Sequence, residues 1–475
     1  MAGSSTPALS YSQEVRWACW PLRVTMGGTI AWIRRLRALI FAITVIATAA
    51  HGLDAVAETL NEALAAAYLT NPDLRAARAA LNQVDERVPE ALAGWRPQVD
   101  LLAGGGYVYT QDGGGEQNTY SASNGPAALV RLRVRQPVYD FSTGSLVQQA
   151  EYAVKGQQAQ LLSVEQQILL QAAQAYLDMI RASALLSYSE EFSTSMNAAL
   201  GSAERQFKEG VVSQSAVAEA RSQNEVARSR VIDAEASLAV AREQYQRVMG
   251  GPPAELAMPD LPRNVPRSQQ EVINASENYP ALLSAIHAER SAKEGVDVNE
   301  GRKLPVFFVE GQADVRSAAV LGLVSVPLYN GLSDPRIRAS KQEAIRARHD
   351  VEARRREARI AAVSAWQAFE RAKAQIAAST ARIDAAAAAA AAVRRERGLG
   401  LKTPSDLYRN ELNVLEAKTN LISAQRDMRV AAFELLAATG QLTARNLDLK
   451  VPLHDETSYY RSVRDAWFGT GPDAD

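Results

Sequence analysis

Apolar residues recur in steps of seven, four and three along long stretches of the chain. In the stretch 214–249 they fall at Ala220, Ala227, Val231, Ala234, Leu238, Ala241, Tyr245 and Val248. The same spacing returns 190 residues later, at Ala417, Leu421, Ala424, Met428, Ala431, Leu435 and Ala438. A seam of this kind is typical of helices packed side by side as in coiled coils. The pattern therefore predicts a mainly helical protein with closely packed, Ala-rich helices.

Two proline-free stretches predict unusually long helices, from Thr143 to Glu209 and from Leu332 to about Arg397. At ~1.5 Å per residue, roughly 65 residues reach about 100 Å. Shorter helices are predicted at about Leu60–Gly94 and about Gln214–Met249, each near half that length. We therefore expect two short helices to stack alongside each long one.

The turns after the long helices carry helix-end signals. Gly210-Val211-Val212-Ser213 and Gly400-Leu401-Lys402-Thr403 each place a glycine where one helix ends and a hydroxyl residue where the next begins. Asp406 adds an acid in the first turn of the following helix, where acids are favoured. We expect both turns to be helix tips, far from any strands.

Two segments with period-two alternation predict β-hairpins, at about 98–136 and about 305–327. In the first, Val130, Leu132 and Val134 alternate with Arg131, Arg133 and Arg135; in the second, Phe307, Val309, Ala313 and Val315 alternate with Glu310, Gln312 and Asp314. A transmembrane β-barrel needs such strands, apolar toward lipid and polar toward a watery lumen. A soluble hairpin with one packed side would show the same pattern. On the barrel interpretation, the three arginines are candidates for the lumen.

Two hairpins supply four strands, which is too few to close a barrel. Open strand edges are not tolerated in lipid. A chain that spans a membrane with these strands must therefore oligomerise through its strand edges. Three copies would give twelve strands, an even number within the known range.

Landmarks repeat along the chain at two offsets. Pro72 and Pro97 correspond to Pro280 and Pro305, 208 residues later, and the landmarks after the first hairpin recur at a shorter offset. Gln136-Pro137-Val138-Tyr139 corresponds to Val326-Pro327-Leu328-Tyr329, and Gly210 and Gly250 correspond to Gly400 and Gly440, all 190 residues apart. The pattern predicts an internal duplication: a first repeat over 58–250, a Pro-rich linker over 251–267, a second repeat over 268–440 and a C-terminal tail over 441–475. Pro137 and Pro327 are the predicted strand-to-helix junctions.

The N-terminal segment has the three parts of a secretory signal peptide. Arg34, Arg35 and Arg37 precede an apolar run over 38–50, and Ala55-Val56-Ala57 forms a small-residue cleavage site. A core helix is the alternative. We expect residues 1–57 to be removed on export, and the long polar stretch before Met26 favours Met26 as the start of translation.

Composition excludes several functional classes. A net charge of −1 argues against a nucleic-acid binder that relies on positive charge. The mean hydropathy of −0.18 excludes a polytopic helical membrane protein. The one cysteine, Cys19, lies in the predicted leader, so the exported chain has no disulfide and no cysteine metal site. His287, His349 and His454 are scattered without ligand spacing. We expect no cofactor, no metal and no enzymatic activity.

The order of these features resembles the TolC family of outer membrane channel-tunnel proteins. The resemblance covers essentially all of 58–450 and is carried by Leu60-Asn61-Glu62-Ala63-Leu64 with Asn71-Pro72, by the strand ends at Pro137 and Pro327, and by the tip glycines Gly210 and Gly400. The closing segment 463–471 (VRDAWFGTG) resembles tails in the type I secretion branch.

The resemblance implies a homotrimer with a twelve-stranded barrel in the outer membrane of a Gram-negative bacterium and a helical tunnel across the periplasm. It implies partners as well: a periplasmic adaptor, or membrane fusion protein, and an inner-membrane pump or ABC exporter. By the same resemblance, Gly210, Val211, Gly400 and Leu401 are candidates for contact with the adaptor. The implied activity is that of an exit duct for type I protein secretion or drug efflux, without catalysis.

The family's tunnels are closed by polar contacts near the tips, and the resemblance places Lys402, Asp406, Arg409 and Arg397 at this entrance. Three positions depart from the family pattern: Ala216 and Arg409 replace usual acids, and Arg397 replaces a usual aromatic residue. We therefore hypothesise a single acidic ring of Asp406, offset by Arg409. The alternative is that Asp406 serves only as a helix N-terminal charge.

Two non-channel functions compete with this interpretation. An exported periplasmic coiled-coil scaffold would fit the leader and the seams but not the basic faces of the hairpins. A periplasmic adaptor would explain a helical hairpin but neither the duplication nor two β-hairpins.

Overall fold

The computed structural model describes residues 59–108, 125–315 and 317–469. The predicted leader, residues 109–124 within the first predicted hairpin, and Arg316 lie outside these residues. The first part contains α2 (Leu60–Thr70), α3 (Pro72–Asp85), α4 (Arg87–Leu92), the 3-10 turn η1 (Ala93–Trp95), β1 (Gln98–Val108), β2 (Gly125–Tyr139), α5 (Phe141–Lys208) and α6 (Gln214–Met249). The second part contains α7 (Gln269–Ala275), the 3-10 turn η2 (Ser276–Asn278), α8 (Pro280–Gly301), β3 (Val306–Asp314), β4 (Ala318–Ser325), α9 (Ser333–Gly398), α10 (Pro404–Ala438) and α11 (Ser458–Val463).

The long helices match the prediction closely, since α5 has 68 residues and α9 has 66. The boundaries of α6, Gln214–Met249, are those expected from the sequence. The predicted seam residues on α6 and α10 are buried or partly buried. The coiled-coil periodicity therefore identified the packed faces correctly.

The single helix predicted over about Leu60–Gly94 is wrong. Three α-helices and a 3-10 turn occupy this segment. Asn71 causes the first break, between α2 and α3. Its side chain caps α3 by accepting hydrogen bonds from the N–H groups of Asp73 and Leu74, at 2.9 and 3.4 Å. Pro72 follows at the first position of α3, where its missing N–H costs nothing. Local capping thus divides a segment whose apolar pattern alone reads as continuous.

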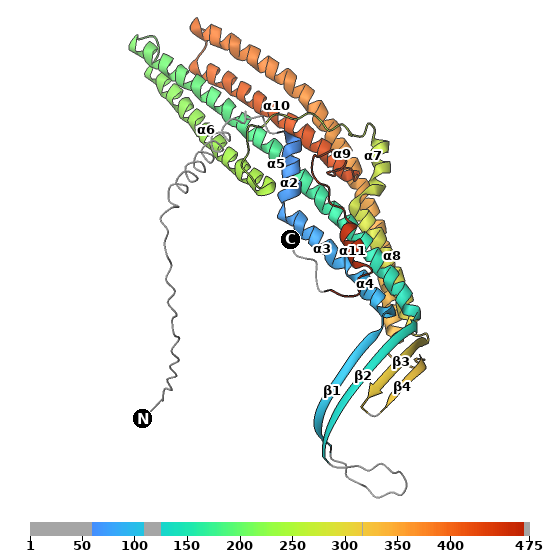
Figure 1. Cartoon of the computed structure of the whole chain (residues 1–475). Helices are drawn as coiled ribbons and strands as arrows, with labels where there is room; N and C mark the ends of the chain where they lie inside the picture. Colours follow the sequence, from blue (N-terminus) through green and yellow to red (C-terminus); the bar gives the residue numbers. More distant parts are fainter. Residues whose placement is uncertain (1–58, 109–124, 316, 470–475) are drawn as a thin grey trace, which may run out of the picture. The chain divides into compact units, whose positions relative to one another are not determined.

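The long helices are flanked by different short helices along their length (Figure 1). Close to the strands, α5 packs against α4 through Val88, Ala91, Ala150 and Val154. Near the opposite end, α5 packs against α6 and α10 through Phe192, Met196, Ala227 and Leu415. The largest core lies between these two clusters and draws residues from α2, α3, α5, α6, α10 and the tail segment 442–449. Short helices therefore follow one another alongside a long one, as their lengths suggested.

The four strands form one antiparallel sheet in the order β1-β2-β3-β4. Val99 pairs with Val134, Arg135 with Glu310, and Phe307 with Val324, which fixes the register of all three strand pairs. Figure 1 shows the sheet at the end of the helical part where α4 and α8 finish, while the α5–α6 and α9–α10 turns lie at the other end. The two classes of predicted site residue are thus separated by the length of the long helices.

Candidate functional site

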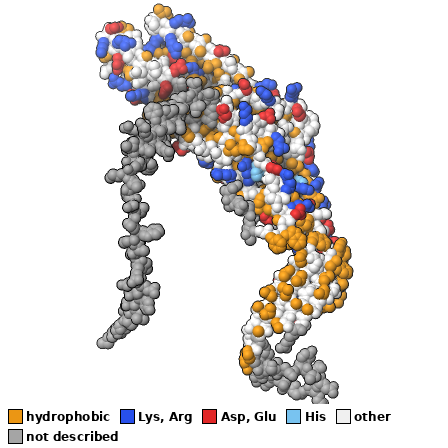
Figure 2. All heavy atoms as spheres, viewed as in Figure 1, with side chains coloured by type: hydrophobic (Ala, Val, Ile, Leu, Met, Phe, Trp, Pro, Cys, Tyr) orange, Lys and Arg blue, Asp and Glu red, His pale blue; other side chains and the backbone are white. Residues whose placement is uncertain are grey.

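One face of the sheet is apolar across all four strands. It carries residues that are 38–77 % exposed in the single chain: Val99, Leu101, Val130, Leu132, Phe307, Val309, Val320 and Val324. Figure 2 shows hydrophobic side chains gathered over the strands, whereas charged side chains are spread over the helical part. An exposed apolar surface of this extent marks an interaction surface.

The opposite face is charged along β2 and β3. Arg131 lies opposite Asp314, and Arg135 lies opposite Glu310. Arg133 makes a diagonal ion pair with Glu310 at 3.5 Å. The guanidinium of Arg135 also lies 4.0 Å from the ring centroid of Phe308. The three arginines predicted for the lumen thus share one face, and acids on the neighbouring strand balance part of their charge.

The strand β4 departs from the alternation because both of its faces are apolar. Leu321 and Leu323 lie on the charged face of the sheet, and Val320 and Val324 lie on the apolar face. The predicted junction residues lie close to the strand ends: Pro137 sits in β2 at a shift in register, and Pro327 follows β4. A proline fits such positions since it cannot donate to a regular ladder.

The two helix tips have the same local geometry. Gly210 and Gly400 both have φ of 76°, a left-handed conformation that favours glycine. The N–H of Val211 donates to the Gln206 carbonyl at 2.8 Å, and the N–H of Leu401 donates to the Glu396 carbonyl at 2.9 Å. These bonds close Schellman-type helix ends. They leave the side chains of Val211 and Leu401 exposed at 69 % and 71 %.

Of the entrance candidates, Asp406 has a definite local role. Its carboxylate accepts hydrogen bonds from the Thr403 N–H at 3.1 Å and the Thr403 hydroxyl at 2.8 Å, while its own N–H donates to that hydroxyl. This capping box lowers the pKa of Asp406, first through the Thr403 N–H, and the charges of Lys402 and Arg409 add to the shift. Asp406 is therefore ionised at neutral pH.

Arg397 connects the second tip to the first long helix. Its guanidinium donates a hydrogen bond to the Ala199 carbonyl of α5 at 3.3 Å. Burial lowers the pKa of Arg397 from its ordinary value. Lys402 and Arg409 point outward from the same tip and are exposed. The structure thus brings Arg397, Lys402, Asp406 and Arg409 to one end of the molecule, with Arg397 alone reaching the neighbouring helix pair.

Near each tip, an ion pair joins the two helices that meet there, and neither pair was predicted from the sequence. On the second tip, Arg394 of α9 binds the carboxylate of Glu411 on α10 with two nitrogens, one of them at 2.7 Å. On the first tip, Arg221 of α6 lies 3.3 Å from Glu204 of α5. The two pairs stand 190 residues apart with their charges exchanged. This signal was available in the sequence, because each tip glycine has one charge six residues before it and the opposite charge eleven residues after it.

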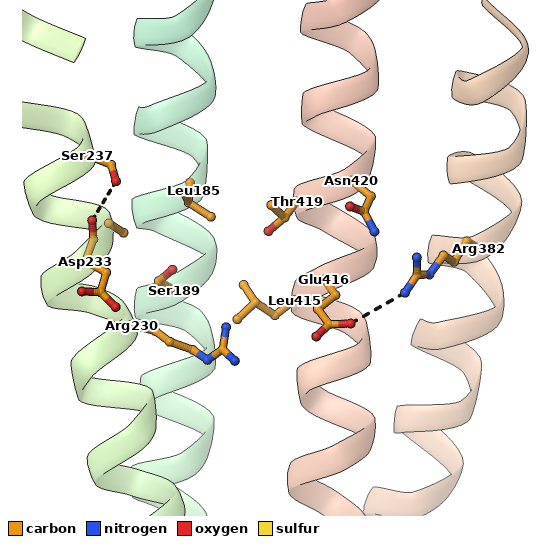
Figure 3. Close-up of a pocket in the computed structure, with 11 residues that line it drawn as sticks. Leu185, Ser189, Arg230, Asp233, Ser237, Arg382, Leu415, Glu416, Thr419 and Asn420 are labelled. Carbon is orange, nitrogen blue, oxygen red and sulfur yellow. Dashed lines mark hydrogen bonds and ion pairs between the residues drawn. The ribbon is translucent and has the colours of Figure 1, made fainter. Parts of the chain in front are cut away.

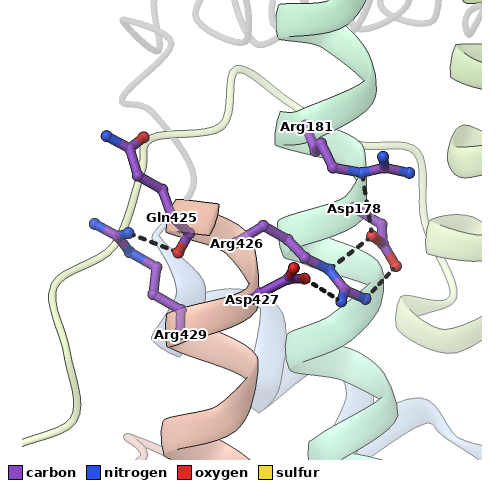
Figure 4. A network of polar contacts seen from close by, with 6 residues as sticks. All are labelled: Asp178, Arg181, Gln425, Arg426, Asp427 and Arg429. Atoms are coloured by element: carbon purple, nitrogen blue, oxygen red, sulfur yellow. Dashed lines mark hydrogen bonds and ion pairs between the residues drawn. The ribbon is translucent and has the colours of Figure 1, made fainter. Parts of the chain in front are cut away.

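A second polar connection joins α5 to α10 nearer the middle of the helices (Figure 4). Arg426 donates to the two carboxylate oxygens of Asp178 at 2.9 and 3.1 Å. Its third nitrogen lies 2.9 Å from Asp427. Two-point recognition of a carboxylate by a guanidinium fixes both distance and orientation. The pair therefore joins α5 to α10 in a defined geometry, in addition to their apolar contacts.

A groove of about 400 Å³ opens between α5, α6, α9 and α10. Figure 3 shows Arg230 extending from α6 toward α10, and Arg382 of α9 paired with Glu416 of α10 at 3.7 Å. Mixed polar and apolar side chains line the groove, without a nucleophile and base held together. Among residues 59–108, 125–315 and 317–469, no cluster of three His, Cys, Asp or Glu side chains is placed to hold a metal ion.

Comparison with known proteins relates this architecture to bacterial export. The sequence model of the outer membrane efflux protein family matches residues 62–251. The chain is 29 % identical to the outer membrane efflux protein BepC of Brucella suis biovar 1 over 443 residues, which cover 90 % of this chain and 95 % of BepC. It is 22 % identical to the outer membrane protein TolC of Escherichia coli K12, covering 82 % of this chain and 84 % of TolC.

The fold is similar to solved outer membrane channels. The Campylobacter jejuni CmeC outer membrane channel superimposes with a TM-score of 0.72 at 14 % identity, over 86 % of this chain and 89 % of CmeC. The likeness covers most of the chain, and its mainly helical fold with a small antiparallel sheet matches these channels. The chain is therefore a TolC-like outer membrane channel, an exit duct of the Gram-negative outer membrane that serves efflux or secretion.

Proposed function

We propose that three copies of the chain assemble into one duct, with a twelve-stranded barrel in the outer membrane and a helical tunnel in the periplasm. The observation that carries the proposal is the four-stranded sheet with β1 and β4 at its open edges and with one apolar and one charged face. Open edges cannot persist in lipid because their N–H and C=O groups have no partners there. Pairing β4 of one copy with β1 of the next gives the N–H and C=O groups of every edge strand a hydrogen-bond partner.

The helical part supports the same assembly. In the half that carries the tips, α6 and α9 flank the α5–α10 pair. Both flanking helices expose apolar side chains: Val226, Ile232 and Val240 on α6, and Ile360 on α9. The exposed alanines of α9 between Ala385 and Ala391 would let another helix approach closely. We expect α6 of one copy to pack against α9 of the next.

An internal duplication would give the trimer six similar halves around the tunnel. The helix-end glycines Gly210, Gly400, Gly250 and Gly440 all have φ between 73° and 79°. Each of the first two ends a long helix, and each of the last two ends a returning helix. This agreement supports the repeats proposed over 58–250 and 268–440, joined by the linker 251–267.

The tips are the proposed docking site for a periplasmic adaptor that serves an inner-membrane pump or ABC exporter. Val211, Leu399 and Leu401 are 69–76 % exposed and stand beside the glycines that end α5 and α9. Apolar side chains held in this way on rigid turns suit helix-to-helix contact with a partner. Substrates would enter there, cross the tunnel and leave through the barrel.

Cysteine cross-linking between strand edges tests the assembly. In a Cys19→Ser background, Leu101→Cys on β1 is combined in turn with Val320→Cys, Gly322→Cys and Val324→Cys on β4. All four positions belong to the apolar face, so we expect at least one pair to yield covalent trimers in isolated outer membranes. Leu101→Cys with Ala319→Cys is the matched control, because Ala319 lies on the opposite face.

Covalent trimers from the same-face pairs, and none from the control, would support edge-to-edge closure. A chain that fractionates as a soluble periplasmic monomer, with no cross-linking in any pair, would contradict it. That result would favour the scaffold function instead.

At the entrance, we propose that the three Asp406 carboxylates form one acidic ring. The capping box separates the two roles of Asp406, since Asp406→Asn keeps a capping side chain without the charge, and Asp406→Ala removes both. We expect both variants to lower cation preference in planar bilayers. Unchanged ion selectivity and unchanged block by cations in Asp406→Asn would leave Asp406 with the capping role only.

A further inference from the structure

We propose that Trp467 and Phe468 of the C-terminal tail form an anchor that inserts into the periplasmic leaflet of the outer membrane. This inference rests on the proposed membrane location of the sheet. It assigns a purpose to the segment 463–469, which neither the barrel nor the helical tunnel requires.

The tail is fastened to the helices next to the sheet. On α11, Tyr459 donates a hydrogen bond to Glu86 at 2.6 Å, and Tyr460 packs against the apolar cluster formed by α4 and α5. Just after α11, Arg464 lies 3.7 Å from Glu151 of α5. These contacts bring the chain from the middle of the bundle to the level of α4, directly before the first strand.

Arg96 then places the aromatic pair. It is two residues ahead of β1, and its guanidinium donates to the Ala466 carbonyl at 2.6 Å. The same guanidinium lies 5.3 Å from the centroid of the Trp467 ring, in a cation–π contact. Trp467 is therefore held at the boundary between the helices and the sheet rather than hanging free.

The exposure of the pair is the unusual feature. Trp467 is 60 % exposed and Phe468 is 94 % exposed, although both are large aromatic side chains beside a well-packed bundle. Trp95, Tyr139 and Phe141 form an edge-on aromatic cluster at the same junction, with centroid distances of 6.1 and 4.7 Å. Aromatic residues gather at membrane–water boundaries because the ring suits the headgroup layer. Arg96, which contacts the Trp467 ring, directly follows Trp95 of this cluster.

Lipid is the occupant that these contacts favour. The apolar face of the sheet starts at Val99, three residues after Arg96, so the membrane proposed for the sheet begins at the level where Arg96 contacts Trp467. A positive guanidinium at this level also suits the phosphate of a phospholipid headgroup. A neighbouring copy of the chain is the alternative occupant, and the experiment separates the two.

The test measures the surroundings of three labelled positions in the full-length chain. In a Cys19→Ser background, bimane is attached to Phe468→Cys, to Val320→Cys on the apolar face of β4, or to Val211→Cys at a helix tip. Trimers in phosphatidylethanolamine and phosphatidylglycerol vesicles are exposed to iodide in water or to lipid with a spin label near its headgroup. Moving one aromatic side chain from water into the lipid raises the equilibrium population of the inserted position over the water-exposed one by a factor of about ten or more.

We expect lipid quenching at Phe468 and Val320, and iodide quenching that is about tenfold weaker at Phe468 than at Val211. Iodide quenching at Phe468 equal to that at Val211 would overturn the anchor. Protection of Phe468 from both quenchers would place it against protein and would overturn it too. If Val320 also lacks lipid quenching, the proposed function fails with it; if Val320 is quenched and Phe468 is not, only the anchor fails.

Arg96→Gln provides an independent check in the Phe468-labelled protein. Loss of the cation–π contact should reduce lipid quenching at Phe468 severalfold while quenching at Val320 stays the same. Arg87→Gln, an exposed arginine on α4, is the matched control and should change neither. Equal behaviour of the two arginine variants would overturn the positioning role of Arg96.

Discussion

Arg394 and Glu411 face each other across the second helix tip, at positions where the first tip has Glu204 and Arg221. The charges are exchanged and the burial differs: the Glu411 side chain is 6 % exposed, whereas those of Arg221 and Glu204 are 67 % and 44 % exposed. Exposed ion pairs contribute little because water and salt screen them. The two tips therefore share their backbone geometry but differ in how tightly their helices are joined.

Arg394→Ala should loosen the second tip. It leaves the Glu411 carboxylate buried without its guanidinium partner, which costs about 1–3 kcal/mol. The measurement is the opening free energy of amides in α9 and α10 near the tip, from hydrogen exchange. Arg221→Ala is the matched control and should change the first tip by less than about 1 kcal/mol. Equal effects at the two tips would contradict the role assigned to burial.

Arg426→Ala should weaken the contact between α5 and α10. The pair with Asp178 is partly buried, at 24 % and 27 % side-chain exposure, so losing one partner costs about 1–3 kcal/mol. Hydrogen exchange in 172–182 and 420–430 should rise accordingly. Arg426→Lys keeps the charge but cannot bind both oxygens in the same way, so an intermediate effect is expected. A lysine variant identical to the native chain would show that charge alone suffices.

Asp85 should make stability depend on pH. It is fully buried at the end of α3, both of its carboxylate oxygens lack a hydrogen-bond partner among the described residues, and burial raises its pKa to about 6. Since the folded pKa lies above the ordinary value of 3.8, the native state holds this proton more tightly than the unfolded chain does. The protonated Asp85 side chain contributes to the free energy of unfolding in full below about pH 4. This contribution, up to about 3 kcal/mol, is lost as the pH rises through about 6.

Asp85→Asn should remove this dependence. Hydrogen-exchange protection of α3 and α4, measured from pH 4 to 7.5 and corrected for intrinsic rates, should fall with pH in the native chain and stay level in the variant. Asp73→Asn, an exposed carboxylate on the same helix, should leave the native slope in place. An unchanged slope in Asp85→Asn would assign the titration to another group.

Gly440→Ala should be more harmful than Gly400→Ala, although both glycines have nearly the same left-handed φ of 73° and 76°. A Cβ at Gly440 would overlap the carbonyl oxygen of Asn278 in η2, whereas a Cβ at Gly400 meets no atom within 4 Å. We expect a loss of about 1–2 kcal/mol at Gly400 from backbone strain and a clearly larger loss at Gly440. The melting temperatures of the two variants give the comparison, and equal values would rule out the close approach of η2.

The sequence by itself determined the lengths of the helices, the positions of the tips and the alternation in β2 and β3. These features depend on neighbours within one or two turns: a glycine that permits positive φ, a hydroxyl that caps, and a period that assigns a face. The segment 60–94 shows the limit of this reasoning, because the side chain of Asn71 ended a helix within an apolar pattern that looked continuous.

Only the tertiary structure decided which side chains meet. Arg426 could pair with Asp178 once α10 lay beside α5, 248 positions away along the chain. Burial of Asp85, overlap at Gly440 and the contact of Arg96 with Trp467 likewise depend on the packing of distant segments. No local signal encodes them, because the energy of each contact comes from removing particular groups from water together, and that depends on the complete arrangement of helices and tail.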